Sequence, residues 1–193
     1  MRLLDLFCGA GGAAVGYHRA GFEVVGVDIL PQPHYPFEFH QADAMTYPLE
    51  GFDAIHASPP CQGYSRMRHL PWLRGKDYPL LIAPTRERLV TSGVAWVIEN
   101  VMDAHLDAGW LCGGMFGLPF YRHRAFETNF FWLQPAHPRH QRVIEAGRML
   151  GARLRRTHAE MKLPWMMPRE RDQAIPPAYT EYIGKWLAQE VLL

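Results

Sequence analysis

The first 28 residues constrain the fold of this chain more than any other stretch. An apolar run, Arg2–Phe7, leads directly into Cys8-Gly9-Ala10-Gly11-Gly12, and residues 13–20 have helical composition up to Gly21. A second apolar run, Phe22–Asp28, ends in an acid. A strand, a glycine-rich turn, a helix and a second strand open a Rossmann-like βαβ unit. We therefore expect an α/β fold with a mostly parallel central sheet flanked by helices.

The glycine-rich turn and the acid that ends the second run together indicate a ligand. Glycines let a backbone approach a ligand closely, and Asp28 can accept hydrogen bonds from ribose hydroxyls. The spacing Gly9-x-Gly11-Gly12 differs from GxGxxG, and no lysine follows it. The pattern predicts a nucleoside-bearing cofactor, either a dinucleotide or S-adenosylmethionine, and argues against a phosphate-binding P-loop.

Three further strands and two helices are expected along the chain. The strands are 37–40, 53–57 and 94–98, and the helices are 79–92 and 176–193. Asp43 and Glu99 follow two of these strands, at the edge where parallel sheets bind ligands. Asp43 has an equally good alternative as a helix N-cap, and Glu99 has one as half of a structural ion pair.

The loop Ser58–Ser65 follows the strand at 53–57 and contains Pro59, Pro60 and Cys61. Two consecutive prolines fix φ and remove two backbone donors, so the chain leaves the strand stiffly and extended. A cysteine held in this way suits a nucleophile. The alternative, a buried small apolar residue, is the commonest environment of a free cysteine.

Composition predicts a cytosolic globular protein without a metal site. The chain has 193 residues, of which 48% are hydrophobic, and no apolar run reaches the ~20 residues of a membrane span. Asp5 interrupts the only apolar N-terminal run, which argues against a secretory signal. The cysteines Cys8, Cys61 and Cys112 form no CxxC pair, so we expect neither disulfides nor a metal site. His137 and His140 are accordingly expected to be surface residues.

Basic residues concentrate in two segments despite a net charge of +1. Residues 66–78 mix arginine, lysine and histidine with aromatic residues, which is typical of a mobile lid over a polyanionic substrate. Seven Lys or Arg and only two Glu lie between His137 and Lys162. This segment predicts contact with a polyanion, with a solvated helix face as the alternative.

The chain resembles the DNA cytosine-5 methyltransferase family. The resemblance covers residues 1 to about 130 and about 165 to the end, and its motifs occur in the family's order. They are Asp5-Leu6-Phe7-Cys8-Gly9-Ala10-Gly11-Gly12, Pro60-Cys61-Gln62, Glu99-Asn100-Val101, Arg122-x-Arg124 and Ala174-Ile175-Pro176-Pro177.

The resemblance implies methyl transfer to carbon 5 of a cytosine flipped out of duplex DNA. It makes Cys61 the nucleophile that adds to carbon 6, and Glu99 the acid that holds or protonates N3. Arg122 and Arg124 would grip the flipped base and orient the catalytic loop. Methylation of tRNA, as in some relatives, and a catalytically inactive binding protein are the alternatives.

The resemblance also implies that the cofactor is S-adenosylmethionine. Phe7 would lie against its adenine, Asp28 would bind its ribose, and Asp43 would bind the adenine amino group. The full set of expected cofactor contacts is Phe7, Cys8, Gly9, Gly11, Gly12, Asp28, Ile29, Asp43, Ala44, Pro60, Ala174 and Ile175. The expected substrate contacts are Gln62, Ser65, Asn100, Arg142, Arg153, Arg155 and Arg156.

The chain departs from the family in the region that selects the target. Relatives insert a long recognition region before the last motif, whereas only about 131–163 is available here. We expect residues 1–130 to form the catalytic domain, 131–163 a minimal recognition lobe, and 164–193 a motif and helix that return to the catalytic domain. Such a lobe predicts phosphate contacts and a short or relaxed target sequence. In its compactness the chain is similar to phage-encoded members, which would act in the host cytoplasm.

Overall fold

The computed structural model describes residues 1–71, 75–140 and 161–193. Seven strands form one sheet in the order β3-β2-β1-β4-β5-β7-β6. The strands are β1 (Arg2–Leu6), β2 (Glu23–Asp28), β3 (Glu38–Gln41), β4 (Ala54–Ala57), β5 (Ala95–Asn100), β6 (Gly109–Leu111) and β7 (Arg124–Thr128).

The first five strands are parallel, and only β7, which lies between β5 and the edge strand β6, runs in the opposite direction. β1 pairs with both β2 and β4, β2 with β3, and β4 with β5, all in parallel. β7 runs antiparallel to both β5 and β6. Because the chain builds outward from β1 in both directions, β1 and β4 flank the topological switch point. Ligands of open α/β sheets bind outside the carboxyl ends of the strands at this point.

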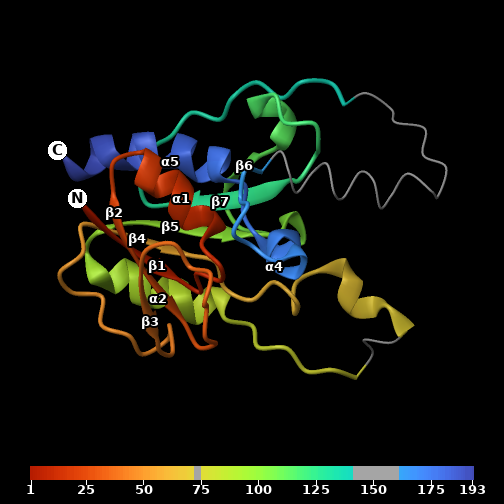
Figure 1. Cartoon of the computed structure of the whole chain (residues 1–193), viewed down its shortest axis with the longest axis horizontal. Coiled ribbons are helices and arrows are strands. Elements are labelled where there is room, and N and C mark those ends of the chain that lie inside the picture. Colours follow the sequence, from red (N-terminus) through yellow and green to blue (C-terminus); the bar gives the residue numbers. More distant parts are fainter. Residues whose placement is uncertain (72–74, 141–160) are drawn as a thin grey trace.

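Helices cover both faces of the sheet (Figure 1). α1 (Gly12–Arg19) and α5 (Pro177–Val191) pack together on one face, and α2 (Ile82–Ser92) lies on the other. The alternation of strand side chains separates two cores: Leu3 faces α1 and α5, whereas Leu4 belongs to the cluster with Leu89 of α2. The sheet is therefore buried on both sides, as its continuous apolar strands require.

The fold class and most elements predicted from the sequence are confirmed. The predicted strand 94–98 continues to Asn100, so Glu99 and Asn100 belong to β5 itself rather than to the following loop. The apolar stretch 106–118 contains β6 and a 3₁₀ helix, Gly113–Phe116. α4 (Pro168–Gln173) was not predicted. Residues 141–150, whose sequence also predicts a short helix, lie outside the described residues.

The C-terminal segment returns to the body of the protein before α4. Met161, Leu163 and Met166 are buried in one cluster with Ala10 and Val15 of the N-terminal unit. This packing brings the last sequence motif, which begins at Ala174, next to the first one, which contains Ala10. The division at 131 and 164 stays a prediction, since most of the expected recognition lobe lies among residues 141–160.

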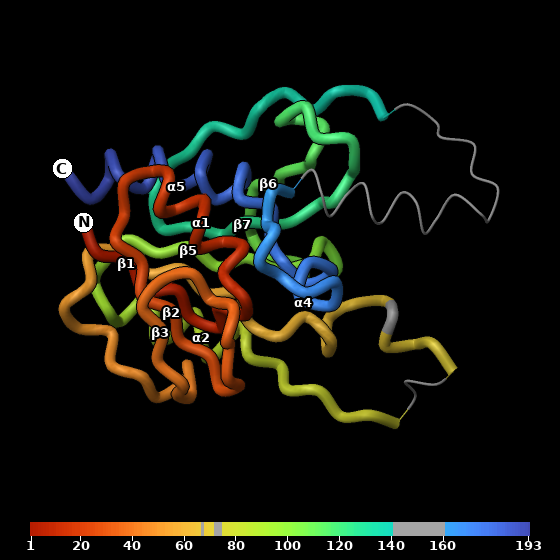
Figure 2. The backbone as a smooth tube through the Cα atoms, viewed as in Figure 1, coloured from red at the N-terminus to blue at the C-terminus, as the bar shows by residue number. Residues whose placement is uncertain are grey.

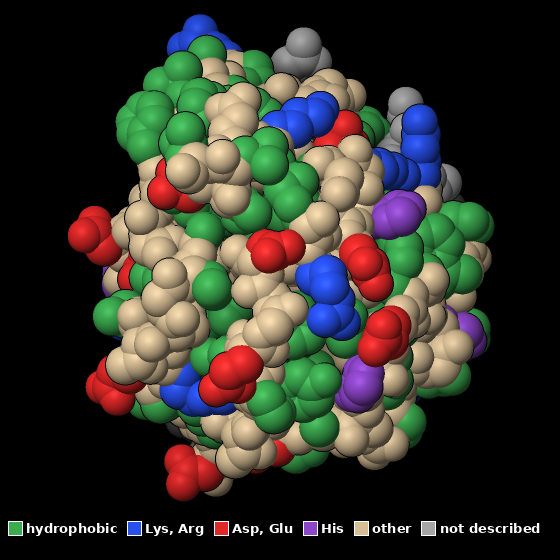
Figure 3. Space-filling view, turned by 90° about the vertical axis from the view of Figure 1, so that its left-hand side faces the viewer, with side chains coloured by type: hydrophobic (Ala, Val, Ile, Leu, Met, Phe, Trp, Pro, Cys, Tyr) green, Lys and Arg blue, Asp and Glu red, His purple; other side chains and the backbone are tan. Residues whose placement is uncertain are grey.

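The two ends of the strands carry different surfaces. Figure 2 shows that residues 58–71 leave the end of β4 and project away from the carboxyl ends of the strands, and that residues 75–81 return to α2. Figure 3 shows the opposite side, near the chain termini, where acidic side chains are spread among basic and apolar ones without a continuous basic surface. No helix in the described ranges is long and apolar enough to cross a membrane.

Candidate active site

Four strand ends at one edge of the sheet carry the residues singled out in the sequence. β1 leads into the glycine-rich turn, β2 ends at Asp28, β4 leads into the proline–cysteine loop, and β5 ends with Glu99 and Asn100. Because these strands are parallel, their carboxyl ends meet at the same edge. The topology thus assembles two neighbouring groups: the glycine-rich turn with Asp28, and Cys61 with Glu99.

The glycine-rich turn is locked onto Asp28 by backbone hydrogen bonds. The amide of Gly9 donates to Oδ2 of Asp28 at 3.0 Å, and the amide of Leu30 donates to Oδ1 at 2.9 Å. Phe7 and Gly9 both have positive φ, 57° and 49°, which turns the chain sharply at the end of β1. A Cβ built on Gly9 would have no heavy atom within 4 Å, so this side of the turn faces open space that a ligand can fill.

The final sequence motif packs directly against this turn. A Cβ on Gly12 would lie 2.7 Å from the carbonyl oxygen of Ile175 and 2.9 Å from Cβ of Ala174. Only glycine allows this approach, since real Cβ atoms do not come so close to backbone oxygens. Ala174 and Ile175 thereby lie beside Gly12 although they are far from it in the sequence.

Three other expected cofactor residues, Ile29, Asp43 and Ala44, lie around the ends of β2 and β3, and Pro60 lies in the loop after β4. Ile29 is 65% exposed, and Ala44 is buried. Asp43 is exposed, and its Oδ1 accepts a hydrogen bond from the amide of Met45 at 2.8 Å. Asp43 therefore caps a turn rather than a helix. The open side of Gly9 and the carboxylate of Asp28 fit a nucleoside-bearing cofactor.

Asp5 is a buried acid beneath the turn that sequence reasoning left without a role. Its Oδ2 accepts a hydrogen bond from the Tyr35 hydroxyl at 3.2 Å, while Oδ1 has no partner among the described residues. Burial raises the pKa of Asp5 to about 8. A buried acid within an apolar run is the sequence signal that could have identified it.

The proline–cysteine loop is held to the end of β5. The side-chain amide of Asn100 donates to the carbonyl of Pro59 at 2.8 Å. The carbonyl of Cys61 accepts the amides of Tyr64 at 3.1 Å and Ser65 at 2.9 Å, which closes a turn immediately after the cysteine. The backbone on both sides of Cys61 is thus fixed.

Cys61 is half-buried and has two arginines nearby. Burial raises the pKa of its thiol, and the positive charge of Arg124 is the largest opposing influence. Glu99 raises the thiol pKa further, whereas Arg122 lowers it. The thiol therefore needs these cations, or a proton acceptor, to become the nucleophilic thiolate.

A buried series of hydrogen bonds connects Tyr17 of α1 to Glu99. The Tyr17 hydroxyl lies 2.9 Å from Nδ1 of His56, and Nε2 of His56 lies 2.9 Å from Oγ of Ser58. Ser58 donates to Oε2 of Glu99 at 2.9 Å. Burial lowers the pKa of His56 to about 3, so the ring is neutral and carries one proton.

When Glu99 is ionised, only one arrangement of donors and acceptors satisfies this series of hydrogen bonds. Ser58 gives its proton to the carboxylate, so it must accept from Nε2–H of His56, and Nδ1 of His56 must then accept from Tyr17. We call Tyr17, His56 and Ser58 the relay. None of the three was named as a site residue from the sequence, although His56 within an apolar strand was a visible signal.

The second oxygen of Glu99 faces Arg124 without a hydrogen bond. Oε1 lies 3.0 Å from Nε of Arg124, but no described group is aligned to donate to it. Burial raises the pKa of Glu99, while Arg124, the bond from Ser58, and then Arg122 lower it. A buried carboxyl with an unsatisfied oxygen beside Cys61 is suited to meet a group on a ligand.

Arg122 is held by the C-terminal segment. Its guanidinium donates to the carbonyl of Asp172, and the Tyr179 hydroxyl donates to the Arg122 carbonyl at 2.6 Å. Burial and the charge of Arg124 lower the pKa of Arg122 to about 10. Tyr179, on α5, thus positions the segment that carries both arginines.

The expected substrate residues are only partly described. Gln62 is exposed and Ser65 is half-buried, both in the turn after Cys61. Arg66, next in the chain, forms an ion pair with Asp103 at 2.8 Å. Arg142, Arg153, Arg155 and Arg156 lie outside the described residues, so their DNA contacts stay predictions.

Comparison with known proteins identifies the family. The sequence model of the C-5 cytosine-specific DNA methylase family matches residues 1–101, more than half of the chain. The chain belongs to this family. No curated protein matches this sequence.

Several solved structures are similar to this chain over part of their length. Spodoptera frugiperda DNMT2, as an E260A/E261A/K263A mutant, has a TM-score of 0.50 at 18% identity, covering 75% of this chain and 55% of its own. A putative DNA modification methyltransferase of an E. coli prophage has a TM-score of 0.48 at 23% identity, covering 65% and 45%. The Dnmt2 methyltransferase of S. pombe has a TM-score of 0.46 at 18% identity, covering 69% and 51%. The chain thus spans about half the length of these proteins.

Proposed function

We propose that this chain transfers a methyl group from S-adenosylmethionine to carbon 5 of cytosine in DNA. The observation that carries the proposal is the pairing of Cys61 with Glu99 at adjacent strand ends. Cys61 sits on a braced loop, and Glu99 is buried with one oxygen free of any described hydrogen-bond donor. Membership of the cytosine-5 family supplies the reaction class.

S-adenosylmethionine supplies an electrophilic methyl group when it is bound. Residues that fit it are the turn Gly9–Gly12, whose open side can receive a ligand, and Asp28, whose carboxylate can accept ribose hydroxyls. Ala174 and Ile175 close the far side of the turn. We propose that Phe7, Ile29, Asp43 and Ala44 complete the nucleoside end.

The chain's own residues activate the base. The Cys61 thiolate adds to carbon 6, which forms a carbon–sulfur bond and makes carbon 5 electron-rich enough to be methylated. Glu99, in its protonated form, gives a proton to N3, so the ring does not accumulate negative charge. A base from solvent then takes the proton from methylated carbon 5, and the electrons of that bond reform the carbon 5–carbon 6 double bond and expel the Cys61 thiolate. N3 returns its proton to the Glu99 carboxylate. The base must be extruded from the duplex for these contacts, at a cost of a few kcal/mol.

The relay and the arginines set the protonation of Glu99. Burial favours the protonated acid, whereas Ser58 and Arg124 favour the carboxylate. Opposed influences of this kind can adjust a carboxyl pKa toward the range needed for proton transfer near neutral pH.

Transfer of labelled methyl groups tests the activity. Wild type and Cys61→Ser are each assayed on duplex DNA, single-stranded DNA and tRNA. We expect transfer to duplex DNA by wild type, and none above background by the variant. Faster transfer to tRNA would assign the RNA substrate instead. Absence of transfer to all three would contradict an active methyltransferase and favour the binding-protein alternative.

A duplex with 5-fluorocytosine tests the covalent step directly. Fluorine cannot leave carbon 5 as the proton does, so an enzyme that adds through Cys61 stays attached to the DNA. We expect a denaturation-resistant adduct with wild type that Cys61→Ser does not form. Sequencing of methylated DNA then tests the relaxed target, which a site of four or more defined bases would contradict.

A further inference from the structure

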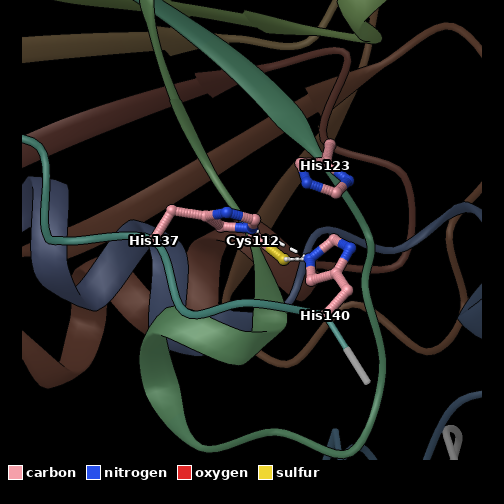
Figure 4. A group of neighbouring side chains, drawn as sticks. All are labelled: Cys112, His123, His137 and His140. Atoms are coloured by element: carbon pink, nitrogen blue, oxygen red, sulfur yellow. Dashed lines mark hydrogen bonds between the residues drawn. The ribbon is translucent and has the colours of Figure 1, made fainter. Parts of the chain in front are cut away.

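Four side chains with metal-binding atoms converge beside β6 and β7, away from Cys61. They are Cys112, His123, His137 and His140, which we call the Cys/His cluster, and their ligand atoms all lie within 4.8 Å of one another. Figure 4 shows them coming from three segments: the residue after β6, the residue before β7, and the chain beyond β7. The sequence predicted no metal site because these residues are not spaced as a motif.

The ligand atoms of the Cys/His cluster lie between 2.9 Å and at most 4.8 Å from one another, a range that spans the separation of ligands around one small cation. Sγ of Cys112 lies 3.3 Å from Nε2 of His140, which lies 2.9 Å from Nε2 of His137. Zinc holds sulfur at ~2.3 Å and nitrogen at ~2.0–2.1 Å, which places tetrahedral ligand atoms roughly 3.3–3.7 Å apart. Two Nε2 atoms that face each other can share only one proton, whereas a cation can accept both lone pairs.

The surrounding rings hold these imidazoles in place. Tyr121 stacks on His140 with ring centroids 3.8 Å apart, and Trp110 packs against His137 at 4.8 Å and His123 at 5.3 Å. Cys112 is fully buried. The cluster is therefore assembled by the fold, since its members pack against neighbouring side chains rather than projecting singly into water.

We propose that Cys112, His123, His137 and His140 bind one structural Zn²⁺ in tetrahedral coordination. The donor set decides the metal class, because one thiol and three imidazoles suit zinc, whereas Mg²⁺ and Ca²⁺ require oxygen ligands. On binding, the Cys112 thiol releases its proton to solvent, and each imidazole donates a nitrogen lone pair. All four positions are filled by protein, which is the pattern of structural rather than catalytic zinc.

Because His123 lies in the arginine segment, the proposed ion would also help to position that segment of the proposed active site. His123 lies between Arg122 and Arg124, and the guanidinium of Arg124 reaches Glu99 while His123 joins the cluster. Neighbouring residues of an extended chain point to opposite sides. The ion therefore holds the arginine segment from the side away from Cys61, and through His137 and His140 it ties the chain beyond β7 to the same edge.

Metal content tests the proposal without reference to methyl transfer. The purified chain, loaded with Zn²⁺ and desalted, is analysed by elemental mass spectrometry. We expect close to one zinc per wild-type chain, and loss of most of it in Cys112→Ser and in His137→Ala. Zinc should raise the melting temperature of wild type and not of these variants. Replacement by Co²⁺ should give the absorption of a tetrahedral site with a thiolate ligand.

His40→Ala is the matched control. His40 is an exposed histidine on β3, at the opposite edge of the sheet, and should keep the full zinc content. Circular dichroism of each variant separates loss of a ligand from loss of the fold. His137 is exposed, so its removal should be well tolerated. Wild type without stoichiometric zinc, or a folded His137→Ala with undiminished zinc and zinc stabilisation, would overturn the site.

Discussion

One histidine-containing cluster lies at the centre of this sheet, on β4, and the other lies beside β6 and β7 at its edge, and the two are organised in opposite ways. In the relay, each polar atom of His56 faces one partner, and the donors run in one direction to Glu99. In the Cys/His cluster, the ligand atoms face one another, and Nε2 of His140 lies near both a sulfur and a second imidazole nitrogen. A directed chain fixes where protons sit, whereas convergent lone pairs fix where a cation sits.

The difference teaches that burial alone does not specify the role of a histidine. His56 is fully buried and satisfied by two hydroxyl groups, so it needs no ion. The cluster histidines are half-buried or exposed and have each other as partners. The role of each histidine depends on the groups that its two ring nitrogens face.

Removal of the acid at the end of the relay should have the largest effect on transfer. Glu99→Gln keeps the size of the side chain but cannot give a proton to N3. We expect methyl transfer to fall by roughly 10²–10⁴-fold, the usual contribution of general acid–base catalysis. Single-turnover transfer to duplex DNA measures it, and zinc content should not change.

Glu127→Gln is the matched control for that substitution. Glu127 is also a buried acid paired with an arginine, at 2.5 Å from Nε of Arg86, but it lies on β7 outside the site. Its loss should lower the melting temperature without lowering transfer per folded molecule. If both variants lost transfer equally, Glu99 would have no more than the structural role of Glu127, and the prediction would be wrong.

Interruption of the relay should have an intermediate effect. Ser58→Ala removes the donor to Oε2 of Glu99 and leaves Nε2–H of His56 without its acceptor. A lost buried hydrogen bond costs about 1–3 kcal/mol, so we expect transfer to fall about 10-fold. Because the Ser58 bond lowers the pKa of Glu99, its removal should shift the alkaline limb of the pH–rate profile to higher pH. A slower variant with an unshifted profile would mean that Ser58 acts on structure alone.

The smallest effect should be a change in how stability depends on pH. The pKa of His56 is lowered from 6.5 to about 3, so the unfolded chain binds this proton more tightly than the folded one. Stability from this group is complete above pH 6.5 and is lost as pH falls toward about 3, by at most about 1.4 kcal/mol per pH unit.

His56→Gln should flatten this dependence. The difference in unfolding free energy between wild type and variant, measured by urea titration at several pH values with excess chelator, isolates His56 from the zinc site. We expect the variant to be less stable at pH 7 and the difference to shrink on acidification. A difference that stays constant from pH 7 to pH 4 would show that His56 is not held neutral.

The sequence predicted the elements that local pattern controls. The strand–glycine–helix–strand opening, the stiff exit to Cys61 and the helix near the C-terminus follow from apolar periodicity, from glycine and from proline, which act within a few residues. α4 escaped prediction because it has only six residues, Pro168–Gln173, too few for a periodic pattern. Glu99 was found, but its place within β5 depended on pairing with β7.

What the sequence determined by itself is the parallel part of the sheet, its ligand-binding edge, and the presence of a cysteine and an acid at that edge. Parallel strands separated by helices leave one edge for their carboxyl ends, so order along the chain already implies proximity there. Tertiary structure alone decided the relay, the contact of Gly12 with Ile175, and the Cys/His cluster. Each joins residues from separate elements through side-chain direction and close packing, and neither quantity is encoded in spacing along the chain.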